Sequence, residues 1–113
     1  MPDVSLFART FNVAAAACVT LLAVADAAVS DAITAGGPEY AAVDFRNAQR
    51  RLDRAHDALA LGDYIAARQL AEEAEVDARL AATRARSAKA VRAAAEVQAS
   101  IRALREELER APQ

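Results

Sequence analysis

The sequence predicts an all-α protein: an antiparallel helical hairpin with a short N-terminal helix, in a coiled-coil-like three-helix arrangement with a long projecting third helix. Alanine supplies 33 of the 113 residues while Pro and Gly number three each, a mix that favours helix over sheet. A second observation is a glycine at position 62 between two segments of the same period. The third is an alanine seam in alternating steps of four and three, which lies on one face of a helix. Its members are Ala67, Ala71, Ala74, Ala78, Ala81, Ala85 and Ala88.

The first helix is predicted over about 26–35, within a single helical domain that spans 26–111. The sequence Gly36-Gly37-Pro38 should end it, because Gly suits the left-handed position past a helix end and Pro suits the first turn of the next helix. Four apolar residues are expected close to one face of this helix: Ala25, Val29, Ala32 and Ile33.

The second helix is predicted over about 38–61, with its own apolar seam in steps of four and three. Gly62 should stop it and Asp63 should cap the helix that follows. So short a connection predicts an antiparallel hairpin, with bulky residues on one helix facing alanines on the other. The seam consists of Ala41, Phe45, Ala48, Leu52, Ala55 and Leu59.

Charges on the two helices suggest how the hairpin is aligned. Counting outward from Gly62 places a row of arginines on the second helix level with an acidic stretch on the third. We expect these groups to pair across the hairpin and to set its register, since exposed pairs contribute only about 0.2–1 kcal/mol each. The arginines are Arg46, Arg50 and Arg54, and the acids are Glu72, Glu73, Glu75 and Asp77.

The third helix is predicted over about 63–111, roughly 70 Å at 1.5 Å per residue. The second helix is long enough to cover it only as far as Ala88, so the remainder should project. Beyond that point the alanine seam ends and a new apolar seam begins. Its residues, Val97, Ile101, Leu104 and Leu108, are candidates for self-association as a homodimer.

Residues 1–25 are interpreted as a signal peptide or a hydrophobic N-terminal segment. Residues 11–25 carry no charge, and Ala23-Val24-Ala25 before Asp26 has the small-x-small form of a cleavage site. Two alternatives remain open. In the first alternative, Cys18, which follows three alanines, is lipid-modified. In the second, residues 11–25 are retained as the buried first half of a long helix.

The run 23–90 resembles a bacterial cell-envelope family of unknown function, alanine-rich and helical, with members that sometimes sit ahead of an OmpA-like domain. The matching pieces include the segments 25–33 and 37–41, the Leu61-Gly62-Asp63-Tyr64 turn, and the Ala and Asp-Ala spacing that follows. The resemblance implies a periplasmic or cell-envelope location. This chain shows no domain after the helices, so a cell-wall-binding role is not carried over.

A cationic run on the third helix is the candidate contact for a partner. It has no acid among its members, but it surrounds the helix instead of forming a stripe, and a solvated surface is the simpler interpretation. The functional alternative is an anionic envelope component or acidic protein, with nucleic acid not expected because aromatic residues are absent nearby. The run comprises Arg79, Arg84, Arg86, Lys89 and Arg92.

No reaction can be assigned from the sequence. His56 has no second His or Cys within helical reach, so we expect a surface polar residue, no metal site and no cofactor. No nucleophile and base set can be assembled, so we expect no enzyme.

The function predicted is a helical scaffold, spacer or interaction module of the cell envelope with a protein partner or itself. Membrane contact is expected only through the N-terminal segment, if that is retained or lipidated. The alternative is a cytosolic helical-bundle regulator, or an adaptor that binds an anionic partner through residues 79–92.

Overall fold

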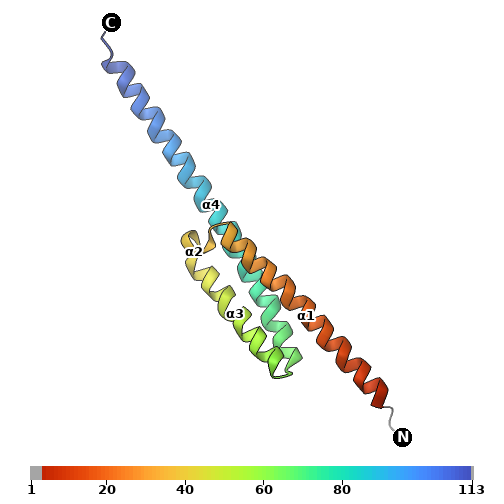
Figure 1. Ribbon diagram of the computed structural model, residues 1–113. Helices are drawn as coiled ribbons and strands as arrows, with labels where there is room; N and C mark the ends of the chain where they lie inside the picture. Colours follow the sequence, from red (N-terminus) through yellow and green to blue (C-terminus); the bar gives the residue numbers. More distant parts are fainter. Residues whose placement is uncertain (1–3, 113) are drawn as a thin grey trace.

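The computed structural model describes residues 4–112 and forms an elongated helical rod (Figure 1). Its helices are α1 (Val4–Thr34), α2 (Gly37–Tyr40), α3 (Ala42–Ala60) and α4 (Tyr64–Arg110). The rod measures 100 × 18 × 13 Å with a radius of gyration of 23.5 Å. A compact chain of this length would have a radius of gyration of about 13 Å. The prediction of an all-α fold with a long, extended last helix is therefore confirmed.

The hairpin of α3 and α4 forms as the two seams predict. Six alanines of the seam, from Ala67 to Ala85, are fully or almost fully buried in the core that α4 shares with α3 and α1. Phe45 and Leu52 fill the opposite side, each 7% exposed, so small residues on α4 let the bulkier side chains of α3 approach closely. The turn uses Gly62 at φ 77°, and the side chain of Asp63 accepts a hydrogen bond from the Ala66 amide at 3.2 Å.

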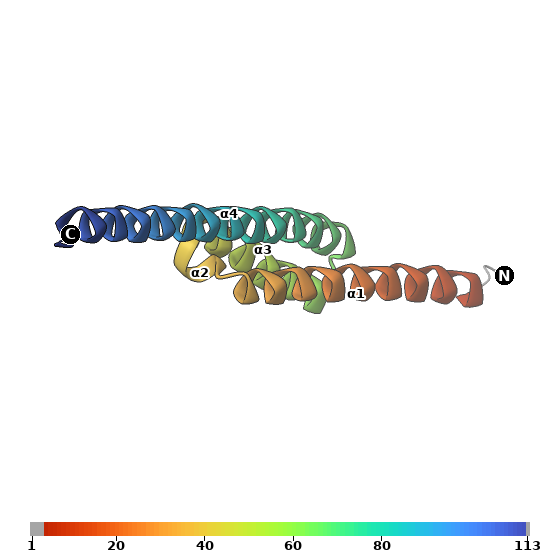
Figure 2. The same ribbon diagram turned by 90° about the horizontal axis from the view of Figure 1, so that it is seen from above.

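The first helix is much longer than predicted, because it begins at Val4 and not near residue 26. It lies parallel to α4: Cys18 contacts Tyr64 near one end of the pair, and Asp31 contacts Arg86 near the other. Figure 2 shows the N-terminal part of α1 extending past the turn between α3 and α4. Residues 1–3 of the predicted leader lie outside the described residues.

Among the α1 side chains that the structure describes, Cys18 is the first that is buried, and burial continues to the end of the helix. Its core residues are Cys18, Leu22, Ala25, Val29 and Ala32, and Ala35 follows in the turn. The prediction for Ile33 is wrong, since it is 53% exposed. One residue corresponds to about 100° on a helix, and Ile33 lies one step past Ala32, which turns it out of the core.

The predicted second helix is broken into two parts. Gly36 takes φ 91° and ends α1, and Pro38 lies in the first turn of the four-residue α2. Ala41 then leaves the helical region at φ −141°, and α3 starts at Ala42. This break forms the corner that redirects the chain from α1 onto the line of α3 (Figure 1).

The predicted arginine row does not align the hairpin. Among the ion pairs of the described residues, the one arginine of α3 that reaches α4 acids is Arg51, which binds Asp77 and also Glu73 at 3.3 Å. The row at positions 46, 50 and 54 points away, because it lies roughly opposite the Phe45–Leu52 seam at 100° per residue. Arg51 flanks that seam and so faces α4.

The second half of α4 projects as a single helix, as predicted. Burial ends at Ala85, Ala88 is half-buried, and residues 89–112 are exposed. The helix continues without a break through position 88 to Arg110. We call residues 89–110 the arm and the packed helices the body.

Candidate interaction surfaces

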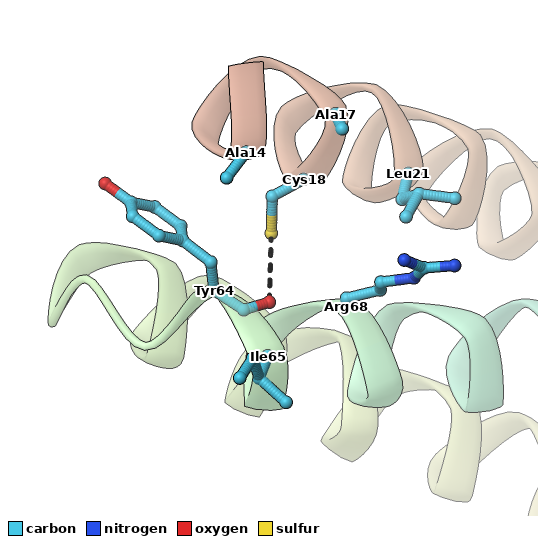
Figure 3. A pocket seen from close by; sticks show the side chains of 7 residues that line it. All are labelled: Ala14, Ala17, Cys18, Leu21, Tyr64, Ile65 and Arg68. Atoms are coloured by element: carbon cyan, nitrogen blue, oxygen red, sulfur yellow. Dashed lines mark hydrogen bonds between the residues drawn. The ribbon is translucent and has the colours of Figure 1, made fainter. Parts of the chain in front are cut away.

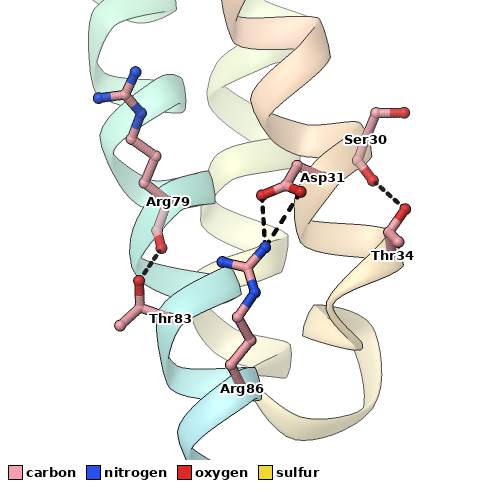
Figure 4. A network of polar contacts seen from close by, with 6 residues as sticks. All are labelled: Ser30, Asp31, Thr34, Arg79, Thr83 and Arg86. Carbon is pink, nitrogen blue, oxygen red and sulfur yellow. Dashed lines mark hydrogen bonds and ion pairs between the residues drawn. The ribbon is translucent and has the colours of Figure 1, made fainter.

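The cationic run on α4 is used mainly to hold the other helices of the body. Arg84 binds Asp44 of α3 at 2.7 Å. Arg86 binds both carboxylate oxygens of Asp31 of α1, at 3.0 and 3.2 Å. Figure 4 shows this α1–α4 pair beside two side-chain to backbone hydrogen bonds within single helices, one of them from Thr83 to the Arg79 carbonyl.

The remaining members of the run have partners in the same chain. Lys89 lies over the ring of Tyr40 in α2, with Nζ 5.7 Å from the ring centroid. Arg92 donates to the Tyr40 hydroxyl at 3.4 Å and lies 3.5 Å from Glu96. Tyr40, and after it Glu96, raise the pKa of Arg92 above its ordinary value, so this side chain stays cationic.

These contacts change how the run is interpreted. Arg79 pairs with Glu75 one turn earlier on α4, so every cation of the run has an intramolecular partner. Because these partners lie on all four helices, with Lys89 and Arg92 sharing Tyr40 of α2, the run does not present one cationic face. It remains exposed, and its role as a contact for an outside partner remains a prediction.

The other predicted polar residues also take part in helix pairing. His56 of α3 lies 3.2 Å from the Asp26 carboxylate of α1, with both side chains about half exposed. Two members of the acidic stretch bind Arg51, as described above, while Glu72 binds Arg68 on its own helix. Within residues 4–112, no group of three or more His, Cys, Asp or Glu side chains is placed to hold a metal ion.

A small apolar cleft opens where α1 meets the start of α4 (Figure 3). Its volume is about 170 Å³. The Cys18 thiol lies at its base, 2% exposed, and donates to the Tyr64 carbonyl with Sγ 3.7 Å from the oxygen. The thiol behaves here as a small buried hydrophobic group. The cleft is lined by Ala14, Ala17, Cys18, Leu21, Tyr64, Ile65 and Arg68.

The segment Asn12–Thr34 of α1 is long and apolar enough to cross a membrane, with a mean hydropathy of 2.0. A signal sequence near the N-terminus or a core helix would have the same properties. Only 22% of this window is buried. Its outward side carries Val13, Val19 and Val24, which are between 42% and 68% exposed.

The predicted apolar seam lies on the arm and is exposed to solvent. We call its four residues the distal seam: Val97, Ile101, Leu104 and Leu108. Their exposed fractions are 59, 43, 64 and 76%, and they lie on one side of the arm in steps of four and three. The described part of the body does not cover this seam, and its role in self-association remains a prediction.

Sequence reasoning missed the partners of the cations. Asp31, Asp44 and Tyr40 were not singled out, because their roles depend on how three helices approach α4. A helical wheel of α3 would have identified Arg51, because this residue flanks the Phe45–Leu52 seam and so faces α4.

Comparison with known proteins gives one match. A family model with the description "Domain of unknown function (DUF4398)" matches residues 20–97, which is more than half of the chain. No curated protein matches the chain, and no solved structure matches it.

Proposed function

Because the chain belongs to the DUF4398 family of domains of unknown function, we propose that it is a non-enzymatic helical spacer and interaction module of the bacterial cell envelope. The observation that carries this proposal is the arm, an unbroken exposed helix that continues from a packed body and bears an apolar seam. Contiguous exposed apolar surface is typical of interaction sites in folded proteins, which supports the proposal.

The body supports the spacer role by fixing the direction of the arm. Cross-helix pairs tie α4 to each of the other helices close to the point where the arm leaves the body: Arg84 to α3, Arg86 to α1 and Lys89 to α2. Because three elements hold α4 where the arm begins, the far end of the arm, roughly 33 Å away, stays in a fixed position relative to the body. The non-enzymatic part of the proposal rests on the sequence, where no nucleophile and base set can be assembled.

The envelope location rests on the apolar N-terminal helix and on the resemblance described above. Cleavage after Ala25 would cut α1 inside the core and remove Cys18, Leu22 and Ala25 from it. The family match also begins at residue 20. Within this proposal, the folded domain therefore keeps α1 from about Cys18 onwards.

Two experiments test the proposal. Small-angle scattering of the purified chain should give an elongated particle, and a compact particle with a radius of gyration near 13 Å would refute the spacer role. Fractionation of the native cell with N-terminal sequencing should recover the protein in the envelope. Recovery in the cytoplasm with Met1 intact would refute the location and favour a cytosolic helical-bundle regulator.

The cytosolic alternative is supported by the packing of α1 from Cys18 to Ala35, which a retained helix would need. An adaptor role through residues 79–92 makes a different prediction. Binding to anionic vesicles or polymers should weaken steeply with salt and on changing Arg84, Arg86 and Arg92 to Gln. Binding that is indifferent to both changes would exclude the adaptor.

A further inference from the structure

We infer that the arm pairs with the arm of a second copy of this chain, in parallel and in register, through the distal seam. This inference deepens the proposed function, since it names the partner of the arm. The four seam residues lie at alternating a and d positions of a heptad pattern, with Ile101 and Leu108 at a and Val97 and Leu104 at d. A two-stranded coiled coil buries such residues on both chains.

The arm is already helical before any partner binds. Isolated helices of two to three heptads are marginal in water, because forming the first turn is costly. Here the helix is nucleated by the body, where α4 is packed from Ala67 to Ala85. The pairing therefore does not need to order the arm, and pre-organisation of this kind favours association.

The charges beside the distal seam complement a second copy in parallel orientation. Glu96 and Glu107 lie on one flank of the seam, and Arg102 and Arg105 lie on the other. Parallel pairing in register places the acidic flank of each arm against the basic flank of its partner. Each flank has one exception in the last turn, since Glu109 lies on the basic side and Arg110 lies on the acidic side.

Antiparallel pairing would bury the same seam but would oppose like charges. In that arrangement Ile101 of one copy packs against Leu104 of the other, and Val97 packs against Leu108. All four seam residues are then buried as well as in the parallel arrangement. It also brings Glu96 near Glu107 of the partner chain and Arg102 near Arg105 of the partner chain, while Arg110 forms one attractive pair with Glu96. The balance of charges therefore favours the parallel orientation, although the apolar contacts supply the affinity.

The central two seam residues agree with this choice. A β-branched residue at a with Leu at d favours parallel dimers, and Ile101 followed by Leu104 has this arrangement, whereas Val97 at d and Leu108 at a reverse it. Ile101 also borders a shallow hollow on the basic flank, which is lined by Gln98, Arg102 and Arg105. In the paired arrangement this hollow lies beside the partner helix.

The association is tested first by mass. Sedimentation equilibrium of the full chain should show a mass that rises with concentration from 11.9 kDa towards twice that value. The double variant Ile101→Asp, Leu104→Asp should stay at the mass of one chain. Val91→Asp is the matched control, because Val91, at 68% exposed, is a more exposed apolar residue of the same arm and is not a member of the seam. This variant should still dimerise.

A wild-type mass that stays at one chain up to about 1 mM would overturn the inference. The proposed spacer would survive that result if scattering still gave an elongated particle, so the two failures are distinguishable. Circular dichroism of each variant should match wild type, since all three substitutions lie on exposed positions of the arm.

Orientation is tested by disulfide crosslinking in a Cys18→Ala background. Two copies of Val97→Cys should form a crosslinked dimer if the arms are parallel and in register. In the antiparallel arrangement the two positions would lie 11 residues apart, about 16 Å, which no disulfide can bridge. Crosslinking confined to a mixture of the Val97→Cys and Leu108→Cys variants would overturn the parallel arrangement.

Discussion

Leu22→Ala is the sharpest test of whether the apolar N-terminal helix belongs to the folded domain. Leu22 lies in α1, is 2% exposed and packs in the core shared by α1, α3 and α4. Truncation to Ala removes about three methylene equivalents at about 0.8 kcal/mol each, which gives about 2.4 kcal/mol of lost burial. The cavity that remains adds to this loss, so we expect the free energy of unfolding to fall by about 2.5–4 kcal/mol.

Val19→Ala is the matched control on the same helix. Val19 is 54% exposed, so its truncation loses under 1 kcal/mol of burial, and the higher helix propensity of Ala offsets part of that loss. Both variants are measured by urea unfolding of the full chain, followed by circular dichroism. Similar unfolding midpoints for Leu22→Ala and wild type would show that α1 is not packed on the hairpin, and the argument for keeping α1 from Cys18 onwards would fail.

Three further predictions concern the body and are measured in the same unfolding assay. Ala78→Leu should destabilise the body by about 1–3 kcal/mol, because Ala78 is fully buried in the core of the body. Ala99→Leu, on the exposed arm, should change the stability little. Equal effects of the two substitutions would contradict the close approach of the helices. Arg51→Gln should cost up to about 1 kcal/mol by removing pairs with two α4 acids, while Arg50→Gln should stay within about 0.5 kcal/mol of wild type. Gly36→Ala should cost about 1–2 kcal/mol, since φ is 91°, a left-handed conformation that L side chains rarely adopt. The added Cβ would also lie 2.6 Å from Cε of Lys89, but this flexible side chain can move aside, and an unchanged stability would show that the corner relaxes freely.

The parts of the fold that were predictable are those fixed by local chemistry. The alanine period, the left-handed Gly62 and the capping Asp63 each act over a few residues, so the sequence alone indicated the hairpin. The length of α4 that the second helix of the hairpin covers could also be predicted by counting residues from Gly62. This count placed the end of burial close to Ala88.

The first helix was harder to predict because its sequence is compatible with several environments. An uncharged apolar run suits a signal sequence, a membrane helix and a core helix alike. These environments differ in what the helix packs against, and the partner of Cys18, the Tyr64 carbonyl, lies 46 residues away along the chain. The break at Ala41 was unpredictable for a related reason, since no Gly or Pro marks it.

The candidate surfaces divide in the same way. The distal seam depends only on the period of one helix and was located from the sequence. The cationic run was also located, but its pairing was not, because Arg84, Arg86 and Lys89 contact three different elements. Their partners follow from how α1, α2 and α3 surround α4.

The change of seam along α4 shows that the body and the arm present separate surfaces. A strict heptad pattern on a straight helix drifts by only about 20° per heptad. The step from the alanine seam to the distal seam is instead a shift of two residues in heptad phase, which corresponds to about 200°. Drift over the few turns between Ala85 and Val97 cannot produce so large a rotation. A partner on the distal seam therefore approaches α4 independently of the α3 contact, and the body need not open for the arm to be occupied.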